Sequence, residues 1–257
     1  MAWNPFAAGY TARTYARARP DYHPYALEEA ARLLSLSPPA GLVIDVGCGT
    51  GMSSRAARRL AGHVVGVEVS EQMLDAATKA AGLAYVRAAA ESLPCRTQRA
   101  ELVITAAAFH WFDQPRVLGE AFRVLRPGGG LIVYTDFFTG EIEGHPEFRE
   151  WLAGTYLARY PSPPRRSRFD EQLARTAGFE LTGEAALSNT VTMTLAGLAD
   201  YMLTQSNATS AIDDGRITPE DMRRWLISEL EAMLAPESPL SLQFGGNLWA
   251  CRKPHAA

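Results

Sequence analysis

Leu42-Val-Ile-Asp-Val-Gly-Cys-Gly-Thr-Gly51 is the stretch that determines the fold. A short β-branched run ends at Val46, and three glycines, Gly47, Gly49 and Gly51, then alternate with small residues. A helical pattern begins directly afterwards, at Met52. Glycine is needed where the backbone turns with a positive φ, or where a ligand must approach the main chain. The stretch therefore predicts a strand, a tight turn and a helix, with a ligand bound over the turn.

The glycine spacing and a downstream acid indicate which kind of ligand this is. The spacing is G-x-G-x-G, and Met52 stands where the dinucleotide pattern G-x-G-x-x-G has its last glycine. A second apolar run, Val64-Val-Gly-Val-Glu68, ends in a carboxylate 23 residues after Asp45. A carboxylate at the end of a second strand can accept hydrogen bonds from both hydroxyls of a ribose. We therefore expect a nucleoside without a pyrophosphate; the alternative is that the glycines only form a turn and Glu68 only ends a strand.

Composition and charge exclude several classes of protein. The chain has 257 residues, of which 47% are hydrophobic and 21% charged, so one domain with a sizeable core can form. A formal net charge of −3 gives no indication of a DNA or RNA partner. The three cysteines are far apart and the five histidines do not cluster, which indicates neither a metal site nor a disulfide framework. Without an apolar run of about 18 residues or a signal sequence, we expect a cytoplasmic protein with no membrane partner.

Strands and helices alternate along the first half of the chain. Apolar and β-branched runs predict strands at 42–46, 64–68, 83–86, 100–105 and 131–134. Helical spacing predicts helices at 24–36 and 52–60, a third that starts after Ser70, and a fourth that Asp113 can cap. This alternation requires right-handed crossovers and a parallel sheet, so the predicted class is α/β.

The alternation stops at residue 135. Helices are expected at 148–160, 169–176, 194–203 and after Thr218, with a basic, proline-rich loop at 161–168. Extended segments are expected at 179–182, 186–193, 240–244 and 247–251, the last two on either side of Gly245-Gly246. Residues 1–23 are rich in aromatic and Arg residues, and they predict either an arm packed on the surface or a cap over the pocket.

Several stretches make the chain similar to a known family. They are Val43–Gly51, Val65–Glu68, Ala90-Glu-Ser-Leu-Pro94, Phe109-His-Trp-Phe-Asp113 and Glu120-Ala-Phe-Arg-Val-Leu-Arg-Pro-Gly-Gly129, with Tyr15-Ala-Arg-Ala-Arg-Pro-Asp-Tyr22 near the start. On these residues the chain resembles the class I S-adenosylmethionine-dependent methyltransferases. Within that family it is similar to the small-molecule branch that includes trans-aconitate methyltransferases and ubiquinone-pathway methyltransferases. The likeness is clear over residues 40–135 and loose after them.

The resemblance implies a Rossmann-like, doubly wound, seven-stranded and mostly parallel sheet with an antiparallel last strand. It also implies an N-terminal arm and an inserted helical cap, all within a single domain of residues 1–257. Residues 1–37 would form the cap arm and its helix, 41–135 the cofactor-binding core, and 136–257 the cap helices and the last strands. The expected partner is a small-molecule substrate, and the expected assembly is a monomer or a homodimer.

The resemblance also assigns roles by position. Gly47 and Gly49 would let the methionine part of the cofactor approach the backbone, and Asp45 would orient its amino group. Glu68 would hold the ribose. Ala90 and Glu91 would flank the adenine, although Ala89 stands where many relatives have Asp. The rest of the expected cofactor site consists of Ala106 and Ala107, beside the methionine part, together with Tyr15, Arg19, Cys48, Val69 and Met73.

The expected reaction is methyl transfer from S-adenosylmethionine to an oxygen of a small carboxylic acid, with S-adenosylhomocysteine as the product. Arg19 or the loop Arg165–Arg168 could hold the acid, and His110 either accepts a proton or shapes the pocket. C-methylation with His110 as the base and a non-catalytic cofactor-binding module stay open as alternatives. Methylation of a nucleic-acid base is disfavoured, because Ala-Phe-His-Trp-Phe stands where exocyclic-amine enzymes have Asn/Asp-Pro-Pro-aromatic.

Overall fold

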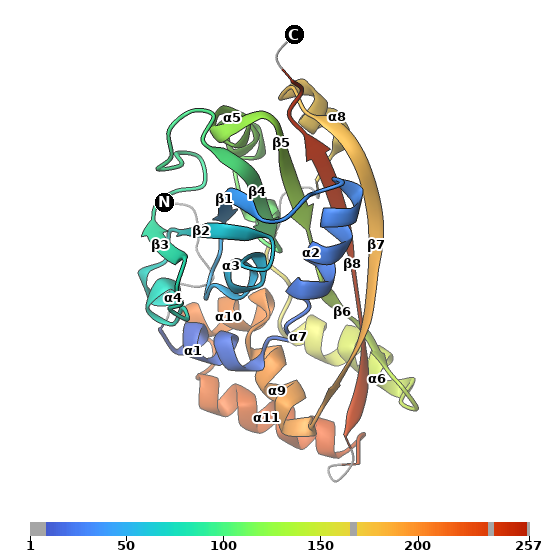
Figure 1. Ribbon diagram of the computed structural model, residues 1–257. Helices are drawn as coiled ribbons and strands as arrows, with labels where there is room; N and C mark the ends of the chain where they lie inside the picture. The colour runs from blue at the N-terminus through green and yellow to red at the C-terminus, as the bar shows by residue number, and fades with distance from the viewer. Residues whose placement is uncertain (1–8, 165–168, 236–238, 256–257) are drawn as a thin grey trace. The chain divides into compact units, whose positions relative to one another are not determined.

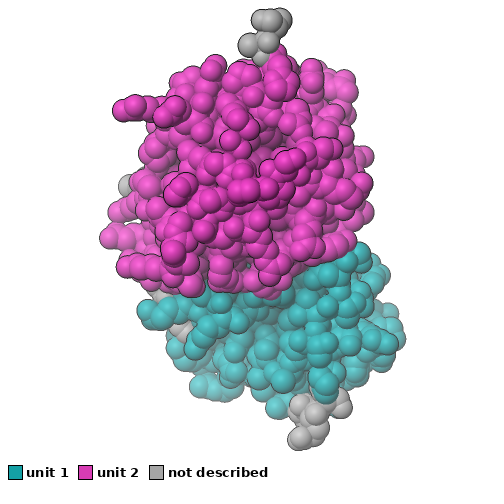
Figure 2. All heavy atoms as spheres, in the orientation of Figure 1, with its two compact units in different colours: residues 1–20, 137–164, 188–245 teal, residues 21–136, 165–187, 246–257 magenta. Residues whose placement is uncertain are grey.

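The computed structural model describes residues 9–164, 169–235 and 239–255. The chain divides into two compact units, which Figure 2 colours separately. Unit 1 comprises residues 1–20, 137–164 and 188–245, and unit 2 comprises residues 21–136, 165–187 and 246–257. The expected single domain with its arm and cap stays a prediction, and the loop Arg165–Arg168 lies outside the described residues.

Unit 2 contains the parallel strands that the alternation predicts. They are β1 (Ala40–Val46), β2 (Ala61–Glu68), β3 (Leu83–Arg87), β4 (Ala100–Ala106) and β5 (Leu125–Tyr134). Their order is β3-β2-β1-β4-β5, so the direction of winding reverses between β1 and β4. In open α/β sheets, ligands bind at such a switch point, outside the carboxyl ends of the strands.

Helices cover both faces of this sheet, which makes it doubly wound (Figure 1). α2 (His23–Leu33) and α3 (Met52–Ala57) pack on the face to which Val43, Leu102 and Ile132 contribute. α5 (Gln114–Val124) and α8 (Glu171–Thr176) pack on the opposite face, against Ile44, Val103 and Val133. Neighbouring residues of a strand point to opposite faces, so each apolar run contributes side chains to the hydrophobic clusters on both faces of the sheet. Both α2 and α3 end three residues earlier than predicted, because tight turns follow them.

The sheet has eight strands among the described residues, not seven as the resemblance implies. β8 (Leu240–Arg252) runs antiparallel to β5 and to β6 (Phe137–Ile142), and β7 (Glu180–Met193) also pairs with β8. The additional strand is β6, where the sequence predicts no element. Burial alternates along it, but an exposed position holds Phe137 and a buried one holds Gly140, so its period of two is not visible in the sequence. The pairs of extended segments expected near β7 and β8 each form one continuous strand.

Unit 1 consists mainly of helices in its described residues. They are α1 (Gly9–Ala18), α6 (Glu147–Trp151), the π-helical turn η2 (Leu152–Tyr156), α7 (Leu157–Arg159), α9 (Leu195–Leu203), α10 (Ser206–Asp213) and α11 (Pro219–Glu231). As predicted, Thr194 and Thr218 begin α9 and α11, since their hydroxyls accept hydrogen bonds from the next turn at 3.1 Å each. The sequence does not predict α10. No described helix has both the length and the apolar character needed to cross a membrane.

Candidate functional site

The turn after β1 has room for a ligand at one glycine and none at another. Gly47 and Gly49 have φ angles of +71° and +54°, in the left-handed region that favours glycine. A Cβ on Gly47 would lie 2.7 Å from the Ala108 Cβ and from the Phe112 ring, so this glycine permits close packing. A Cβ on Gly49 would meet only the Met73 side chain, at 3.9 Å. A ligand can therefore approach the main chain at Gly49.

Asp45, at the end of β1, is fully buried. Its Oδ2 accepts hydrogen bonds from the hydroxyls of Ser53 and Ser54, each at 2.6 Å, whereas its buried Oδ1 has no partner among the described residues. Burial raises the pKa of Asp45 to about 6, the two serines oppose this, and the charge of Glu68 raises the pKa further. A cationic ligand group at Oδ1 would satisfy that oxygen and favour the ionised carboxylate.

Glu68, at the end of β2, supports two backbone turns. Its Oε2 accepts a hydrogen bond from the N–H of Gly49 at 3.1 Å, and its Oε1 accepts from the N–H groups of Val69 and Ser70, both at 2.9 Å. A carboxylate can accept about four hydrogen bonds, so these contacts leave capacity for a hydroxyl. The next side chain, Val69, is 54% exposed and offers an apolar surface, while Met73 in α4 (Glu71–Asp75) is buried.

The N–H groups of Gly47 and Cys48 tie the glycine turn to the neighbouring strand. Both donate to the carbonyl of Val67 in β2, at 2.8 and 3.1 Å. The Cys48 side chain is buried. These contacts hold the ends of β1 and β2 together, so Asp45 and Glu68 stand at the same edge of the sheet.

Among the hydrogen bonds that join the segments after β3 and β4, one reaches the start of α5. Glu91 Oε1 accepts it from the N–H of Asp113, at 2.9 Å. Asp113 occupies the N-cap position of α5, but its side chain makes no capping hydrogen bond, contrary to expectation. Glu91 therefore fixes the start of α5, and its neighbour Ala90 is buried.

The residues after β4 follow an uncommon path. Ala107 has a φ of +49°, in the left-handed region, and its N–H donates to the carbonyl of Tyr134 at 2.8 Å. Non-glycine residues held in this region cluster at functional sites. His110 lies in a short 3₁₀ turn, η1 (Phe109–Trp111), with its ring centroid 4.8 Å from that of Trp111. Ala106, Ala107 and His110 thus stand at the carboxyl end of β4, beside the switch point.

Comparisons with known proteins decide the family. A methyltransferase domain model matches residues 44–133. A malonyl-[acyl-carrier protein] O-methyltransferase from Enterobacter lignolyticus is 32% identical over 185 residues, which are 68% of this chain and 70% of that protein. The chain belongs to the class I S-adenosylmethionine-dependent methyltransferases. A second protein of the same description, from Pectobacterium atrosepticum, is 35% identical over 128 residues, and the chain covers only half (50%) of its length.

Solved structures share the fold of this methyltransferase. A protein from Anaeromyxobacter dehalogenans, described as a type II methyltransferase, aligns with a TM-score of 0.69 at 24% identity, over 89% of this chain and 97% of that one. A phosphoethanolamine N-methyltransferase from Haemonchus contortus, solved with S-adenosylhomocysteine, aligns with a TM-score of 0.51 at 19% identity, over 90% and 53%. The doubly wound sheet is therefore the one that methyltransferases of this class use.

S-adenosylmethionine is accordingly the cofactor of this methyltransferase, and the residues at the switch point fit it. The accessible main chain at Gly49 suits the close approach of a ligand. The unsatisfied Oδ1 of Asp45 suits an amino group, and Glu68 retains capacity for a hydroxyl. The roles assigned to individual residues stay predictions.

Two residues predicted to bind the cofactor belong to unit 1. The guanidinium of Arg19 donates to Thr204 Oγ1 and to the Thr204 carbonyl, both at 2.8 Å. The same group lies over the rings of Tyr15 and Tyr201, at 4.8 and 5.0 Å from their centroids. Tyr15 and Arg19 thus contact each other and other residues of unit 1, and their role at the cofactor stays a prediction.

Sequence reasoning missed two features of unit 2 at this edge. Ser53 and Ser54 hold Asp45; two hydroxyls in the first turn of a helix, shortly after a buried acid, were a signal that could have been used. His23 Nδ1 lies 2.8 Å from the Tyr134 hydroxyl at the end of β5, and both side chains are buried. These two residues are 111 positions apart in the sequence, so no local pattern indicates that they pair.

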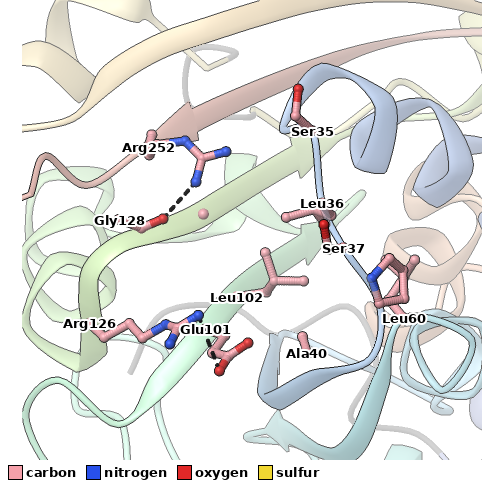
Figure 3. A pocket seen from close by; sticks show the side chains of 12 residues that line it. Ser35, Leu36, Ser37, Ala40, Leu60, Glu101, Leu102, Arg126, Gly128 and Arg252 are labelled. Carbon is pink, nitrogen blue, oxygen red and sulfur yellow. Dashed lines mark hydrogen bonds and ion pairs between the residues drawn. The ribbon is translucent and has the colours of Figure 1, made fainter.

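A cavity of about 210 Å³ lies at the other edge of the sheet, where β1, β4 and β5 begin (Figure 3). Two contacts cross its wall: Arg126 pairs with Glu101 at 3.2 Å, and Arg252 donates to the Gly128 carbonyl at 2.7 Å. Both arginines therefore tie strand ends together. Because parallel α/β sheets bind ligands at the carboxyl edge, we assign this cavity no part in the site.

Proposed function

We propose that this methyltransferase transfers the methyl group of S-adenosylmethionine to an oxygen of a small carboxylic acid. The observation that carries the proposal is the 32% identity to a malonyl-[acyl-carrier protein] O-methyltransferase over 68% of the chain. A methyl group on that kind of substrate goes to an oxygen. The proposed substrate has only a carboxylate in common with the substrate of that relative.

The chemistry asks little of the protein beyond binding and orientation. Bound S-adenosylmethionine supplies an electrophilic methyl group on a sulfonium. One carboxylate oxygen forms the new C–O bond as the S–C bond breaks, and the electron pair stays on sulfur. Carboxylates are ionised at neutral pH, so no proton has to be removed. Proximity, alignment and exclusion of water can then supply most of the rate.

Four of the predicted site residues have a stated role in this scheme. The Oδ1 of Asp45 would accept from the cofactor's ammonium group, and Glu68 would accept from a ribose hydroxyl. Val69 would cover one side of the adenine. His110 would shape the acceptor side of the pocket, because an ionised acid needs no general base.

The nature of the product and the effect of one substitution test this scheme. The protein is given a carboxylic acid panel and S-adenosylmethionine labelled in its methyl group, and the products are treated with mild base. A methyl ester releases volatile labelled methanol, whereas a C-methyl product does not. His110→Ala should keep ester formation within about tenfold, since a loss below roughly 1.4 kcal/mol is expected for a residue that is not the base.

The control for this test is His63→Ala, which changes an exposed histidine on β2. It should leave turnover unchanged. A base-stable product together with a collapse of rate in His110→Ala alone would replace this scheme with C-methylation, in which His110 removes a proton. Cofactor binding with no turnover across the panel would instead point to a non-catalytic module.

A further inference from the structure

Unit 1 contains a pocket of about 410 Å³, and Arg19, one of the residues predicted at the cofactor, helps to line it. It lies among the end of α1, the last residues of β7 and the first turns of α9, and all of its lining residues belong to unit 1. Small-molecule pockets in proteins typically have volumes of about 300–1,000 Å³. The pocket is therefore large enough for a metabolite of modest size.

The charges that line this pocket are unbalanced. Arg17 and Arg19 contribute two guanidinium groups, and Asp200 contributes one carboxylate. Asp200 already pairs at 2.6 Å with Arg223, which does not line the pocket. The Arg17 side chain makes no ion pair or hydrogen bond to any residue that the structure describes. The pocket therefore offers a net positive charge to an anion.

Arg19 is held in a fixed orientation. Its two hydrogen bonds to Thr204, both 2.8 Å, and the aromatic rings of Tyr15 and Tyr201 restrain its guanidinium. Thr204 is itself buried, and its hydroxyl donates to the Tyr201 carbonyl at 2.6 Å. A guanidinium ordered in advance loses less conformational entropy when an anion binds. Carboxylates match the planar fork of guanidinium donors particularly well.

An apolar wall completes the pocket. Val191 and Met193 line it from β7, and both pack against the hydrophobic core of unit 1. Residues two apart in a strand share one face, so the two side chains form a continuous surface. We propose that the pocket binds an organic acid, with its carboxylate at Arg17 and Arg19 and its short carbon chain along Val191 and Met193. The inference goes beyond the proposed methyl transfer, because it concerns binding alone.

Calorimetric titration of the full chain with pentanoate and hexanoate tests the proposal. Both acids should bind, and the neutral analogue 1-pentanol should not. Arg17→Gln should weaken binding of the acids roughly tenfold or more, as expected for the loss of charge-assisted hydrogen bonds. Arg17→Lys keeps the charge and should recover a large part of the affinity. Asp200→Asn removes the only carboxylate among the described lining residues and should tighten binding.

The matched control is Arg13→Gln, an exposed arginine on the same helix that does not line the pocket. It should leave the affinity unchanged, and circular dichroism should show that all variants keep the fold. Failure of both acids to bind at millimolar concentration would overturn the proposal. Equal losses in Arg13→Gln and Arg17→Gln, or equal binding of 1-pentanol, would do so too.

Discussion

The Glu68 carboxylate has two functions at one position. Its three backbone hydrogen bonds order the glycine turn and the start of α4, and the proposed ribose contact adds to them. Loss of the side chain would therefore weaken cofactor binding through a missing acceptor and through a looser turn. The carboxylate at this position would therefore contribute more to cofactor binding than a single hydrogen bond does.

Glu68→Ala should lower the affinity for S-adenosylhomocysteine by about 1–3 kcal/mol, as measured by calorimetry, because a ribose hydroxyl loses its acceptor and the glycine turn loses the carboxylate that orders it. The control is Glu71→Ala, which removes a nearby exposed carboxylate that pairs with Arg87 at 3.0 Å. That variant should bind as the wild type does. Unchanged affinity in Glu68→Ala would remove Glu68 from the cofactor site.

His23 gives the stability of the protein a dependence on pH. Burial lowers the pKa of His23 from 6.5 to about 4, with Asp21 raising it and Arg55 lowering it by smaller amounts. Burial holds the pKa of Tyr134 well above its usual value, so the phenol keeps its proton and shares a hydrogen bond with the neutral imidazole. The unfolded chain binds this proton at a higher pH than the folded chain does. The contribution of His23 to the free energy of unfolding is therefore fully present at neutral pH and is lost as the pH falls from about 6.5 to 4.

His23→Gln keeps a hydrogen-bond acceptor for Tyr134 and removes the titration. Relative to this variant, the wild type should lose about 2 kcal/mol of unfolding free energy between pH 7 and pH 5, measured by urea titration. His63→Gln, an exposed control, should show the wild-type profile. Asp45 acts in the opposite sense, because its raised pKa favours the folded state as pH falls through 6, and it is present in every variant. Identical profiles for wild type and His23→Gln would refute this account.

At the scale of the element, the continuity of β8 depends on Gly246, where the sequence suggests a break between two extended segments. A Cβ on Gly246 would overlap the backbone carbonyl of Thr135 and lie 3.1 Å from the Asp136 Cα. The N–H of Thr135 donates to the Asn247 carbonyl at 2.9 Å, so the two backbones are held at this distance. The glycine pair therefore marks a close backbone approach within one strand and not a turn between two.

Gly246→Ala should destabilise the protein by about 3 kcal/mol or more, because backbone atoms cannot move aside as a flexible side chain can. Gly62→Ala is the control: this exposed glycine in β2 has no neighbouring atom within 4 Å of the added Cβ. That variant should stay within about 0.5 kcal/mol of wild type in urea unfolding. Equal stability of the two variants would show that the strand can shift at Gly246.

Elements with a regular period could be predicted from the sequence, and irregular ones could not. The strands from β1 to β5 combine apolar, β-branched runs with helical spacing between them, so local pattern and tertiary structure agree. β6 could not be predicted because Phe137 stands at an exposed position and Gly140 at a buried one, so its apolar residues do not alternate. α10 has a polar sequence, Ser-Asn-Ala-Thr-Ser, although most of it is buried, so no amphipathic stripe indicates it.

At the scale of the whole molecule, the sequence predicts those site residues that the order of the parallel strands brings to one edge of the sheet. Parallel strands end at one edge, so Asp45, Glu68 and Ala107 could be placed together from their order in the chain alone. The pocket of unit 1 that is proposed to bind an organic acid and the His23–Tyr134 pair both involve side chains from distant segments. No spacing rule brings these side chains together. Each unit is likewise assembled from separate segments, with no linker composition to mark the division.

The position of β8 has a consequence for biosynthesis. It is the last of the strands that the structure describes, yet it pairs with β5, β6 and β7, which all leave the ribosome before it. Until it emerges, β5 and β6 each expose an unpaired edge, and such edges promote aggregation of nascent chains. Both units therefore finish folding only once β8 has left the ribosome, and a nascent chain stalled before residue 240 would be a natural client for chaperones.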